Sequence, residues 1–336
     1  MKHTKIPVAI IGASGYTGLE LIKMLSQHPA FEIAYVATSE GDISLTQLHP
    51  SLEGIIEADV EKADPKAVAA SCKLAFLALP HKTAMEFVKA LIKESVKVVD
   101  LSADYRLKRM TYEAHYVPHI DPVNLEHAVY GLPELNRGAI MSADLVANPG
   151  CYPTATILGA LPFMEYRVAG TPLIVDAKSG VSGAGKKCSH NTHYVSINEN
   201  AFAYNPLGHR HGPEIAEKLN VEEEEVSFVP HLLPVTRGML SSVYMQVEGD
   251  FDPITLLQAY YKGEPFVRIR TQPSDMKSVA GTNFCDIYAK RKGDMLFITS
   301  AIDNLLRGAS SQAVANANLM MGLDEAAGLP LIAYVP

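Results

Sequence analysis

The chain has 336 residues, enough for two domains, and a formal net charge of −8 at pH 7. This acidic balance argues against nucleic acids and anionic membranes as partners. No apolar run reaches the ~18 residues of a membrane-spanning helix, and the first residues lack the pattern of a signal peptide, so we expect a cytoplasmic location.

The first predicted element is a buried parallel strand over Ile6–Ile11, a continuous apolar run. Residues 12–18 follow as a glycine turn with the spacing G-x-x-G-x-x-G rather than G-x-G-x-x-G, and helical spacing begins directly after it. Strand, glycine turn and helix in this order are typical of a dinucleotide site, although a purely structural turn is the alternative. The predicted cofactor-binding residues of this turn are Gly12, Ser14, Gly15, Tyr16, Thr17 and Gly18.

The end of the second predicted strand, residues 31–37, bears on the choice between NAD and NADP. A carboxylate at this position favours NAD because it binds the ribose hydroxyls. This chain has Thr38 and Ser39 there, and hydroxyls accept a 2′-phosphate without repelling it. We therefore predict NADP(H), with Glu40 on the ribose as the alternative.

Further strands are predicted at 74–79 and 96–101, with a helix at 83–92 between them. This alternation is typical of an α/β, doubly wound parallel sheet, in which ligands bind at the carboxyl ends of the strands. Residues 79–81 and 100–106 are expected at that edge. Arg106 is predicted to clamp an anion, with a surface ion pair to Asp104 or Glu113 as the alternative.

Cys151 is the predicted nucleophile. A strand-like run at 143–147 and the turn Asn148-Pro149-Gly150 precede it, and a helix is predicted to begin near Thr154. A thiol at the start of a helix is favoured as thiolate, the nucleophilic form. The alternative is a small buried apolar residue.

Two stretches further along contain candidate site residues, one for the cofactor and one for a partner of Cys151. Residues 179–185 form a second glycine loop without a P-loop ending, and its backbone can approach a cofactor closely. In residues 208–215, His211 lies three positions before Glu214, so the carboxylate can orient the imidazole at a helix start. An oriented histidine suits a thiolate, whereas the alternative is a surface turn.

The rest of the chain contributes widely spaced cysteines and a series of strands with polar alternation. The cysteines at 72, 151, 188 and 285 are typical of reduced thiols. The spacing C-x-H-x-x-H from Cys188 matches no standard zinc site, so we predict no metal. Alternating strands at 226–229, 240–247, 267–271, 283–289 and 295–301 predict a largely antiparallel second sheet, and a helix is predicted from 302 through 321.

The motifs at 12–18, 148–154, 178–185, 209–214 and 303–318 resemble, in order, those of the N-acetyl-γ-glutamyl-phosphate reductase family of arginine biosynthesis, a relative of aspartate-semialdehyde dehydrogenase. The resemblance implies a Rossmann-type NADP-binding domain (1–148 and 306–336), to which the C-terminal helix returns. It implies an α+β catalytic and dimerisation domain (149–305), and a homodimer or homotetramer. Sister enzymes acting on carrier-bound aminoadipyl phosphate share these motifs, and aspartyl phosphate is a further alternative.

The resemblance also implies roles for the catalytic residues in converting an acyl phosphate to an aldehyde and inorganic phosphate. Cys151 accepts the acyl group as a thioester, and His211, with Glu214 behind it, is the acid and base. We also expect Ser182, Gly183 and Asn316 to contact the cofactor and His209 to contact the substrate. Charge and position, rather than the resemblance, favour Arg106 for the phosphate and Arg237 for the substrate carboxylate.

Overall fold

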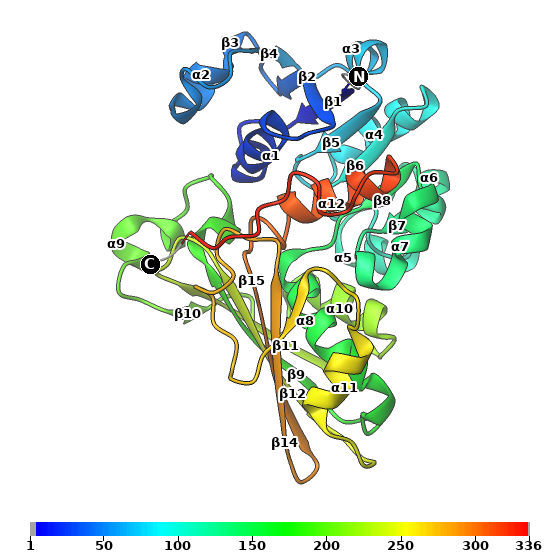
Figure 1. The fold of residues 1–336 in the computed structure, drawn as a ribbon, viewed down its shortest axis with the longest axis vertical. Coiled ribbons are helices and arrows are strands. Elements are labelled where there is room, and N and C mark those ends of the chain that lie inside the picture. The colour runs from blue at the N-terminus through cyan, green and yellow to red at the C-terminus, as the bar shows by residue number, and fades with distance from the viewer. Residues whose placement is uncertain (1–4, 335–336) are drawn as a thin grey trace. The chain divides into compact units, whose positions relative to one another are not determined.

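The computed structural model describes residues 5–334, which form two compact units (Figure 1). The first unit comprises the described residues up to Pro149 together with Ala309–Leu329. The second comprises Gly150–Gly308 and the residues after Leu329. Each unit is built on one sheet. No helix among the described residues has the length and apolar character needed to cross a bilayer.

The first unit has an eight-stranded sheet in the order β3-β4-β2-β1-β5-β6-β8-β7. All pairings are parallel except that of β3 with β4. The strands are β1 (Ile6–Ile11), β2 (Phe31–Thr38), β3 (Ile43–Ser44), β4 (Asp59–Lys62), β5 (Leu74–Leu77), β6 (Lys97–Asp100), β7 (Val129–Tyr130) and β8 (Leu145–Ala147). The predicted doubly wound parallel sheet is therefore confirmed.

Helices cover both faces of this sheet because its central strands are apolar throughout. In β1, Ala9 and Ile11 belong to the core formed with α3 and α4, so alternation turns Val8 and Ile10 toward the opposite face. There α1 packs on α12, and α12 on α7. The helices are α1 (Tyr16–Ser26), α2 (Leu45–Leu48), α3 (Pro65–Ser71), α4 (Ala84–Lys93), α5 (Arg109–His115), α6 (Pro122–His127), α7 (Pro133–Ser142) and α12 (Ser310–Met320).

The second unit has a seven-stranded mixed sheet in the order β10-β11-β9-β12-β15-β14-β13. Four neighbouring pairs are antiparallel, and β11 with β9 and β13 with β14 are parallel. The strands are β9 (Leu173–Gly180), β10 (Phe202–Ala203), β11 (Val226–Leu233), β12 (Met239–Gln246), β13 (Val267–Ile269), β14 (Cys285–Lys292) and β15 (Met295–Ile302). The prediction of a mostly antiparallel second sheet is confirmed.

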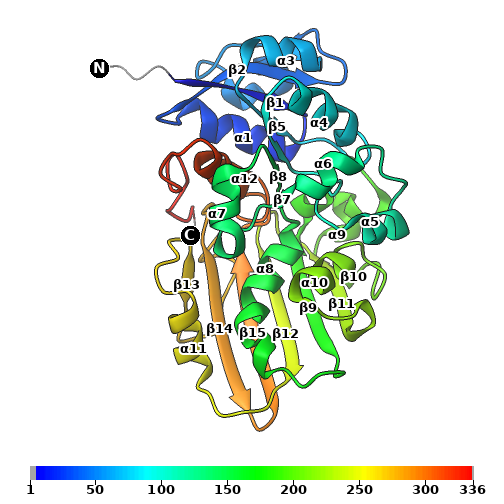
Figure 2. The ribbon, with the colours of Figure 1, turned by 90° about the vertical axis from the view of Figure 1, so that its right-hand side faces the viewer.

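One face of this second sheet is covered by helices, which lie in front of the strands in Figure 2. These are α8 (Cys151–Ala160), α10 (His211–Leu219) and α11 (Pro253–Tyr260). The short α9 (Tyr194–Ile197) lies apart from them, at the left in Figure 1. Along β9, Leu173, Val175 and Ala177 are buried, whereas Ile174 between them is exposed. The opposite face of the sheet is thus the more accessible one in the second unit.

Several predicted boundaries were wrong by two or more residues, and three of them have a clear physical reason. The strand predicted at 226–229 runs on to Leu233 through Pro230, which is tolerated because the outer neighbour β10 pairs only with the two residues that follow it. Helix α8 begins at Cys151 and not near Thr154, because a proline at the third helical position, Pro153, loses no internal hydrogen bond. Helix α12 begins at Ser310, since residues 303–308 are not helical.

Candidate active site

Cys151 is the first residue of α8, with Gly150 as the N-cap. No side chain among the described residues caps this helix start, so its N–H donors and the positive end of its dipole lie around the thiol. The rest of α8 is buried, and Thr154 Oγ1 donates to Gly150 O at 2.9 Å. The half-buried cysteine therefore lies at the start of a well-packed helix.

A glycine packs directly against this cysteine. A Cβ built on Gly308 would lie 2.7 Å from Cys151 Cβ and 2.6 Å from Asn304 O. Real Cβ atoms essentially never show contacts this short, so only glycine fits at position 308 without displacing its neighbours. The segment 303–308 thus packs directly beside Cys151, the predicted nucleophile.

Helix α10, which packs against α8, begins at His211. The ring of His211 lies 5.8 Å from the ring of Tyr152, the residue after Cys151, and 4.8 Å from the ring of His209. Glu214, in the first turn of the same helix, is 1 % exposed and its Oε1 accepts a hydrogen bond from Gly150 N at 2.9 Å. The starts of the two helices are thereby tied together.

His209 lies among aromatic rings and supports His211. Its ring is edge-on to the rings of Tyr152, Tyr204 and Phe228 at 5.8, 5.5 and 5.4 Å. Burial lowers the pKa of His209 to about 4, and the charge of Arg210 acts in the same direction. Its Nδ1 accepts from His211 N at 3.1 Å, which places the proton of the neutral ring on Nε2.

Arg237 and the second glycine loop lie at the end of the sheet in the second unit. Gly180 N donates to Gly238 O at 2.9 Å, and a Cβ on Gly180 would lie 2.8 Å from Thr236 O, so this glycine is required for the close approach of the two loops. Ser182 and Gly183 follow in a short 3₁₀ helix, Val181–Ala184. The guanidinium of Arg237 lies 3.5 Å from the buried carboxylate of Asp303.

In the first unit, the glycine turn fits a dinucleotide pyrophosphate. Gly12 has φ +95°, and a Cβ there would lie 2.2 Å from Ala78 O; a Cβ on Gly18 would lie 2.5 Å from Gly12 O. Both glycines are therefore required by the fold itself. A Cβ on Gly15 would come no closer than 3.8 Å to the atoms compared, so the fold leaves room there for a ligand.

The start of α1 adds hydrogen-bond donors to this turn. Gly15 is the N-cap, and no described side chain caps the helix, so its first N–H groups can meet phosphate oxygens. Ser14 and Tyr16 are exposed, and Thr17 O accepts from Ser310 Oγ at 2.9 Å. The last contact fixes α12 to the start of α1.

The hydroxyls of Thr38 and Ser39, at the end of β2, differ in their surroundings. Thr38 is buried and its Oγ1 accepts from Gly41 N at 3.0 Å, so this hydroxyl shapes the turn. Ser39 is exposed and is the better placed of the two to meet a 2′-phosphate.

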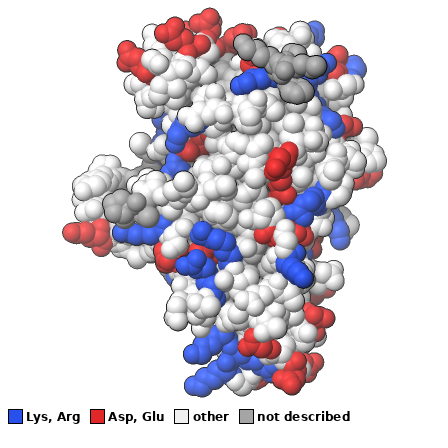
Figure 3. Space-filling model, in the orientation of Figure 1, with Lys and Arg blue, Asp and Glu red and all other residues white. Residues whose placement is uncertain are grey.

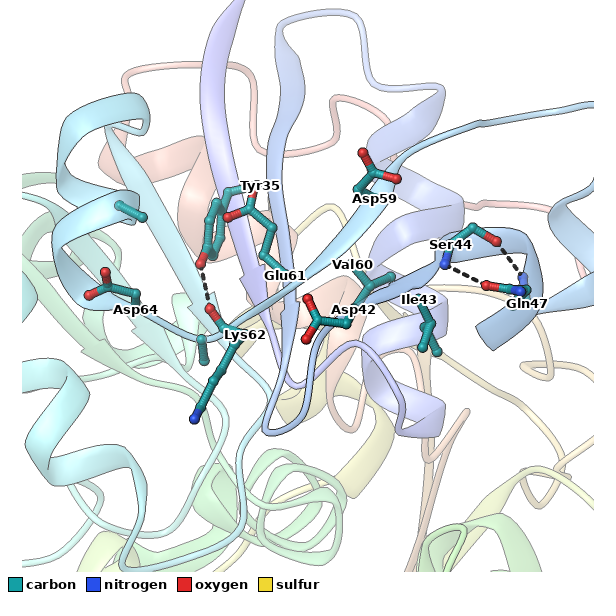
Figure 4. Close-up of a pocket in the computed structure, with 12 residues that line it drawn as sticks. Tyr35, Asp42, Ile43, Ser44, Gln47, Asp59, Val60, Glu61, Lys62 and Asp64 are labelled. Carbon is teal, nitrogen blue, oxygen red and sulfur yellow. Dashed lines mark hydrogen bonds between the residues drawn. The ribbon is translucent and has the colours of Figure 1, made fainter.

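An open cavity of about 1000 Å³ lies near this edge of the first sheet, between β3, β4 and the end of β2 (Figure 4). Four carboxylates line it, against one lysine, Lys62; they are Asp42, Asp59, Glu61 and Asp64. Acidic side chains also gather on the surface of this part of the unit (Figure 3). Because carboxylates repel phosphate, this cavity does not suit the 2′-phosphate.

Arg106 is buried, and not at the surface where the alternative placed it. Its Nε donates to Asn148 O and its Nη2 to Leu101 O, both at 2.8 Å. Asn148 Oδ1 in turn accepts from Asn316 Nδ2 at 3.1 Å, and Asn316 Nδ2 also donates to Gly131 O at 2.8 Å. Arg106 and Asn316 thus join the strand ends of the first unit around Asn148.

Both halves of the chain match models of one enzyme family. Residues 7–143 match the semialdehyde dehydrogenase NAD binding domain, and residues 151–304 match the semialdehyde dehydrogenase dimerisation domain. A protein named N-acetyl-gamma-glutamyl-phosphate reductase from Sulfurimonas denitrificans is 64% identical over 331 residues, which cover 98% of this chain and 99% of that protein. Its namesake from Wolinella succinogenes is 59% identical and covers 99% of each chain. The chain belongs to the N-acetyl-γ-glutamyl-phosphate reductase family.

Solved structures of the wider group share the fold of this reductase-family chain. Aspartate semialdehyde dehydrogenase II from Vibrio cholerae superposes with a TM-score of 0.73 at 15% identity, covering 95% of this chain and 99% of that one. The Candida albicans aspartate semialdehyde dehydrogenase solved with NADP gives a TM-score of 0.70 at 13% identity. These structures confirm the predicted two-domain α/β fold.

Two tyrosines of this reductase-family chain were not predicted. Tyr204 OH donates to Tyr152 OH at 3.0 Å, and both rings contact His209. Burial raises the pKa of Tyr204 to about 12 and that of Tyr152 further, with the nearby Cys151 acting in the same direction on both. Both phenols stay protonated at neutral pH. Tyr152 has a sequence signal in its place beside the cysteine, whereas Tyr204 has none.

Proposed function

We propose that the chain reduces N-acetyl-γ-glutamyl phosphate to N-acetylglutamate 5-semialdehyde and inorganic phosphate with NADPH, a step of arginine biosynthesis. The observation that carries the proposal is the packing of two helix starts, with Cys151 on α8 and His211 on α10. Relatives at 46–64% identity over nearly the full chain all carry the name of this activity. They favour it over the alternatives with carrier-bound aminoadipyl phosphate or aspartyl phosphate.

In the first step Cys151 acts as the nucleophile. Its sulfur forms a bond to the acyl carbon, the bond from that carbon to the phosphate oxygen breaks, and inorganic phosphate leaves with the electron pair. The positive end of the α8 dipole stabilises the attacking thiolate. The product of this step is a thioester on Cys151, whose carbonyl accepts hydride more readily than a carboxylate does.

In the second step the thioester becomes an aldehyde. NADPH supplies the hydride when it is bound, with Gly12, Gly15 and Gly18 as the proposed cradle for its pyrophosphate. His211 donates a proton to the carbonyl oxygen of the thioester, giving a thiohemiacetal. The same histidine takes a proton back as the carbon–sulfur bond breaks, which releases the aldehyde and restores the Cys151 thiolate.

We assign the proton transfer to His211 rather than to His209. His209 is neutral near pH 7, because burial lowers its pKa to about 4, and its Nδ1 accepts from the main chain of His211. A neutral ring that is held in this way is a poor proton donor. His209 instead fixes the start of α10, and it can contact the substrate through Nε2.

The arginines have different proposed roles. Arg237 recognises the substrate carboxylate, for which a guanidinium provides two parallel donors. Arg106 already donates to the carbonyls of Asn148 and Leu101, so we propose that it mainly shapes the turn that leads to Cys151. Ser39, Ser182, Gly183 and Asn316 stay proposed cofactor contacts.

We further propose that the protein is a homodimer in the cytoplasm. The second unit matches a dimerisation domain, and the helix-free face of its sheet carries an apolar row. The strand register aligns Ile174, Tyr244 and Phe297 across β9, β12 and β15. Ile174 is 43% exposed, and the rings of Tyr244 and Phe297 lie 5.1 Å apart. Such a row is suited to pack against its copy in a second subunit.

The test is NADPH oxidation with each of the three acyl phosphates before and after alkylation of the thiols. The proposal expects turnover with N-acetyl-γ-glutamyl phosphate at least a hundredfold faster than with the other two, because a site built for one polar substrate leaves groups unpaired with another. Alkylation of Cys151 is expected to abolish this turnover. Unchanged rates after alkylation, or a preference for aspartyl phosphate, would contradict the proposal.

A further inference from the structure

A buried acid–amide pair follows β15 and has no part in the steps above. Asp303 is 0% exposed and Asn304 is 2% exposed. Charged and amide side chains are rarely buried without partners, so the contacts of this pair indicate what it does.

The strand register places this pair beside Arg237. In the antiparallel pairing of β12 with β15, which run side by side in Figure 2, Met239 lies opposite Ile302. The residues that precede Met239 therefore face those that follow Ile302. Asp303 and Asn304 are thus brought to the turn that carries Arg237 by the sheet itself.

The two oxygens of Asp303 have different tasks. Its Oδ1 accepts from Leu305 N at 2.8 Å and Leu306 N at 3.0 Å, which closes the turn after β15. Its Oδ2 accepts from Gly281 N at 2.8 Å and lies 3.5 Å from Arg237 Nη1. One oxygen is therefore sufficient for the turn, and the other meets the guanidinium of Arg237.

Asn304 holds the backbone next to this arginine. Its Oδ1 accepts from Gly238 N at 2.8 Å, and its Nδ2 donates to Ser182 Oγ at 3.0 Å. Gly238 O also accepts from Gly180 N at 2.9 Å. Because the main chain beside Arg237 is fixed on these sides, the direction of its guanidinium is set by side-chain contacts, of which the ion pair with Asp303 is one.

We infer that Asp303 is a positioning residue for the substrate: it holds one edge of the Arg237 guanidinium so that another edge is presented to the substrate carboxylate. A guanidinium has five N–H donors in a rigid plane, so an acid on one edge fixes the direction of the rest. The inference rests on the proposed function, which supplies the carboxylate. A purely structural Asp303 would only accept from the main-chain N–H groups of Leu305, Leu306 and Gly281.

The Asp303→Asn variant separates the turn contacts at Leu305 and Leu306 from the contact with Arg237, because an amide keeps one oxygen for the turn but presents an NH₂ group to Arg237. The NH₂ group also faces Gly281 N, so the melting temperature is measured alongside the kinetics. The assay is the reverse reaction, phosphate-dependent NADP⁺ reduction by N-acetylglutamate semialdehyde. We expect the KM for the semialdehyde to rise about tenfold and the KM for NADP⁺ to change less than about twofold, since only the contact with the substrate is misdirected. The matched control is Asp286→Asn, which also removes a buried carboxylate that pairs with arginines, Arg268 and Arg270, in the same unit. For this control both KM values should stay within about twofold of wild type.

A double-mutant cycle tests whether Asp303 acts through the arginine. In an Arg237→Lys background, Asp303→Asn should raise the semialdehyde KM by no more than about twofold further, because the effects of substituting two residues in contact do not add. Full additivity would overturn the inference. Equal rises in both KM values, accompanied by a lower melting temperature, would also overturn it and leave Asp303 with the structural role alone.

Asp303→Ser gives a second route if the asparagine variant does not fold. A serine hydroxyl can still accept from the N–H groups two and three residues ahead, but it does not replace the oxygen that faces Arg237. The readout is the rate at which Cys151 reacts with iodoacetate relative to neutral iodoacetamide, which requires no turnover. A positioned arginine favours the anion, and loss of the Asp303 carboxylate would by its charge alone also favour it. A fall of the ratio by at least threefold in Asp303→Ser therefore reports the lost position of the guanidinium, and the same fall is expected in Arg237→Lys. An unchanged or higher ratio in Asp303→Ser would overturn the inference. If the wild-type protein shows the ratio but no turnover of the semialdehyde, the proposed function fails and the positioning role does not.

Discussion

Glu214 on α10 accepts a hydrogen bond from the main-chain N–H of Gly150, the residue that precedes Cys151. The N···O distance is 2.9 Å, and Glu214 is 1% exposed. This contact joins the helix that carries the proposed acid, His211, to the turn that precedes the proposed nucleophile, Cys151. It also places a negative charge in the first turn of α10, where the helix dipole stabilises it.

Replacing this carboxylate is expected to loosen the nucleophile. Glu214→Ala leaves Gly150 N–H without its acceptor, so we expect the free energy of unfolding to fall by about 2 kcal/mol, the range for a hydrogen bond to a buried charged group. We also expect a lower kcat and a slower reaction of Cys151 with iodoacetamide. Glu214→Gln keeps an oxygen for Gly150 N. It should therefore recover more than half of the loss in the free energy of unfolding, in kcat and in the rate of reaction with iodoacetamide. Equal behaviour of the two variants would contradict this role.

Cys151→Ser is expected to be inactive although it is nearly isosteric. A serine hydroxyl does not ionise near neutral pH and cannot form a thioester, so we expect kcat to fall by at least about a thousandfold. The midpoint of urea unfolding should stay within experimental error of wild type, because Cys151 is only half-buried. The measurement is NADPH oxidation alongside denaturation. Activity within tenfold of wild type would exclude Cys151 as the nucleophile.

Gly308→Ala is expected to displace the nucleophile by overpacking. The new Cβ would lie 2.7 Å from Cys151 Cβ and 2.6 Å from a main-chain oxygen, and overpacking of this kind costs about 1–3 kcal/mol. We expect reduced kcat with little change in the KM for NADP⁺. The control is Gly138→Ala, where no atom lies within 4 Å of the new Cβ and the residue is helical. If both variants behave like wild type, the segment 303–308 has no influence on Cys151.

The buried His28 is expected to lower the free energy of unfolding as the pH falls. It is 0% exposed, and its Nδ1 accepts from Phe31 N at 2.9 Å while its Nε2 faces Ala327 O at 2.9 Å. Burial lowers its pKa below 6.5, so below that pH the unfolded state binds a proton that the folded state resists, and stability falls as pH falls. His28→Gln should reduce the slope of unfolding free energy against pH between 7.5 and 5 by up to about 1.4 kcal/mol per pH unit. The exposed His127→Gln serves as control, and an unchanged slope in His28→Gln would refute the assignment.

The parts of the molecule that the sequence predicts are those set by local rules. The apolar run Ile6–Ile11 and the glycines after it specify strand, turn and helix start by residue 18, because Gly12 allows the positive φ that the turn needs. The same holds for Cys151, which is placed at a helix start by the Asn-Pro-Gly turn. The boundary error near Thr154 is also local, since a proline fits at any of the first three helical positions.

The parts that escaped prediction depend on pairing between distant segments. Tyr204 reaches Tyr152 only because β10 pairs with β11, and Asp303 reaches Arg237 only through the register of β12 with β15. Neither contact leaves a periodic signal in the chain, because its two members are 52 and 66 residues apart. The role of Gly308 was missed for the same reason. A glycine in an irregular segment is read from the sequence as part of a turn, and its close contact with Cys151 is visible only in the fold. Sequence reasoning thus located the proposed reacting groups at their helix starts, but it missed the side chains that lie around them.

The helix-free face of the second sheet predicts how the protein associates. A stable homodimer buries about 1,200–2,000 Å² in total, and a face lined by Ile174, Tyr244 and Phe297 offers an apolar centre for such an interface. Phe297→Glu puts a charge at that centre in both subunits, where two like charges would meet near the twofold axis. We expect sedimentation velocity to show a dimer for wild type and a monomer for this variant at micromolar concentration. Met110→Glu is the matched control, because Met110 is an apolar residue of the first unit that is 86% exposed, and it should leave the dimer intact. A dimer that persists in Phe297→Glu, with an unchanged melting temperature, would place the interface on another surface.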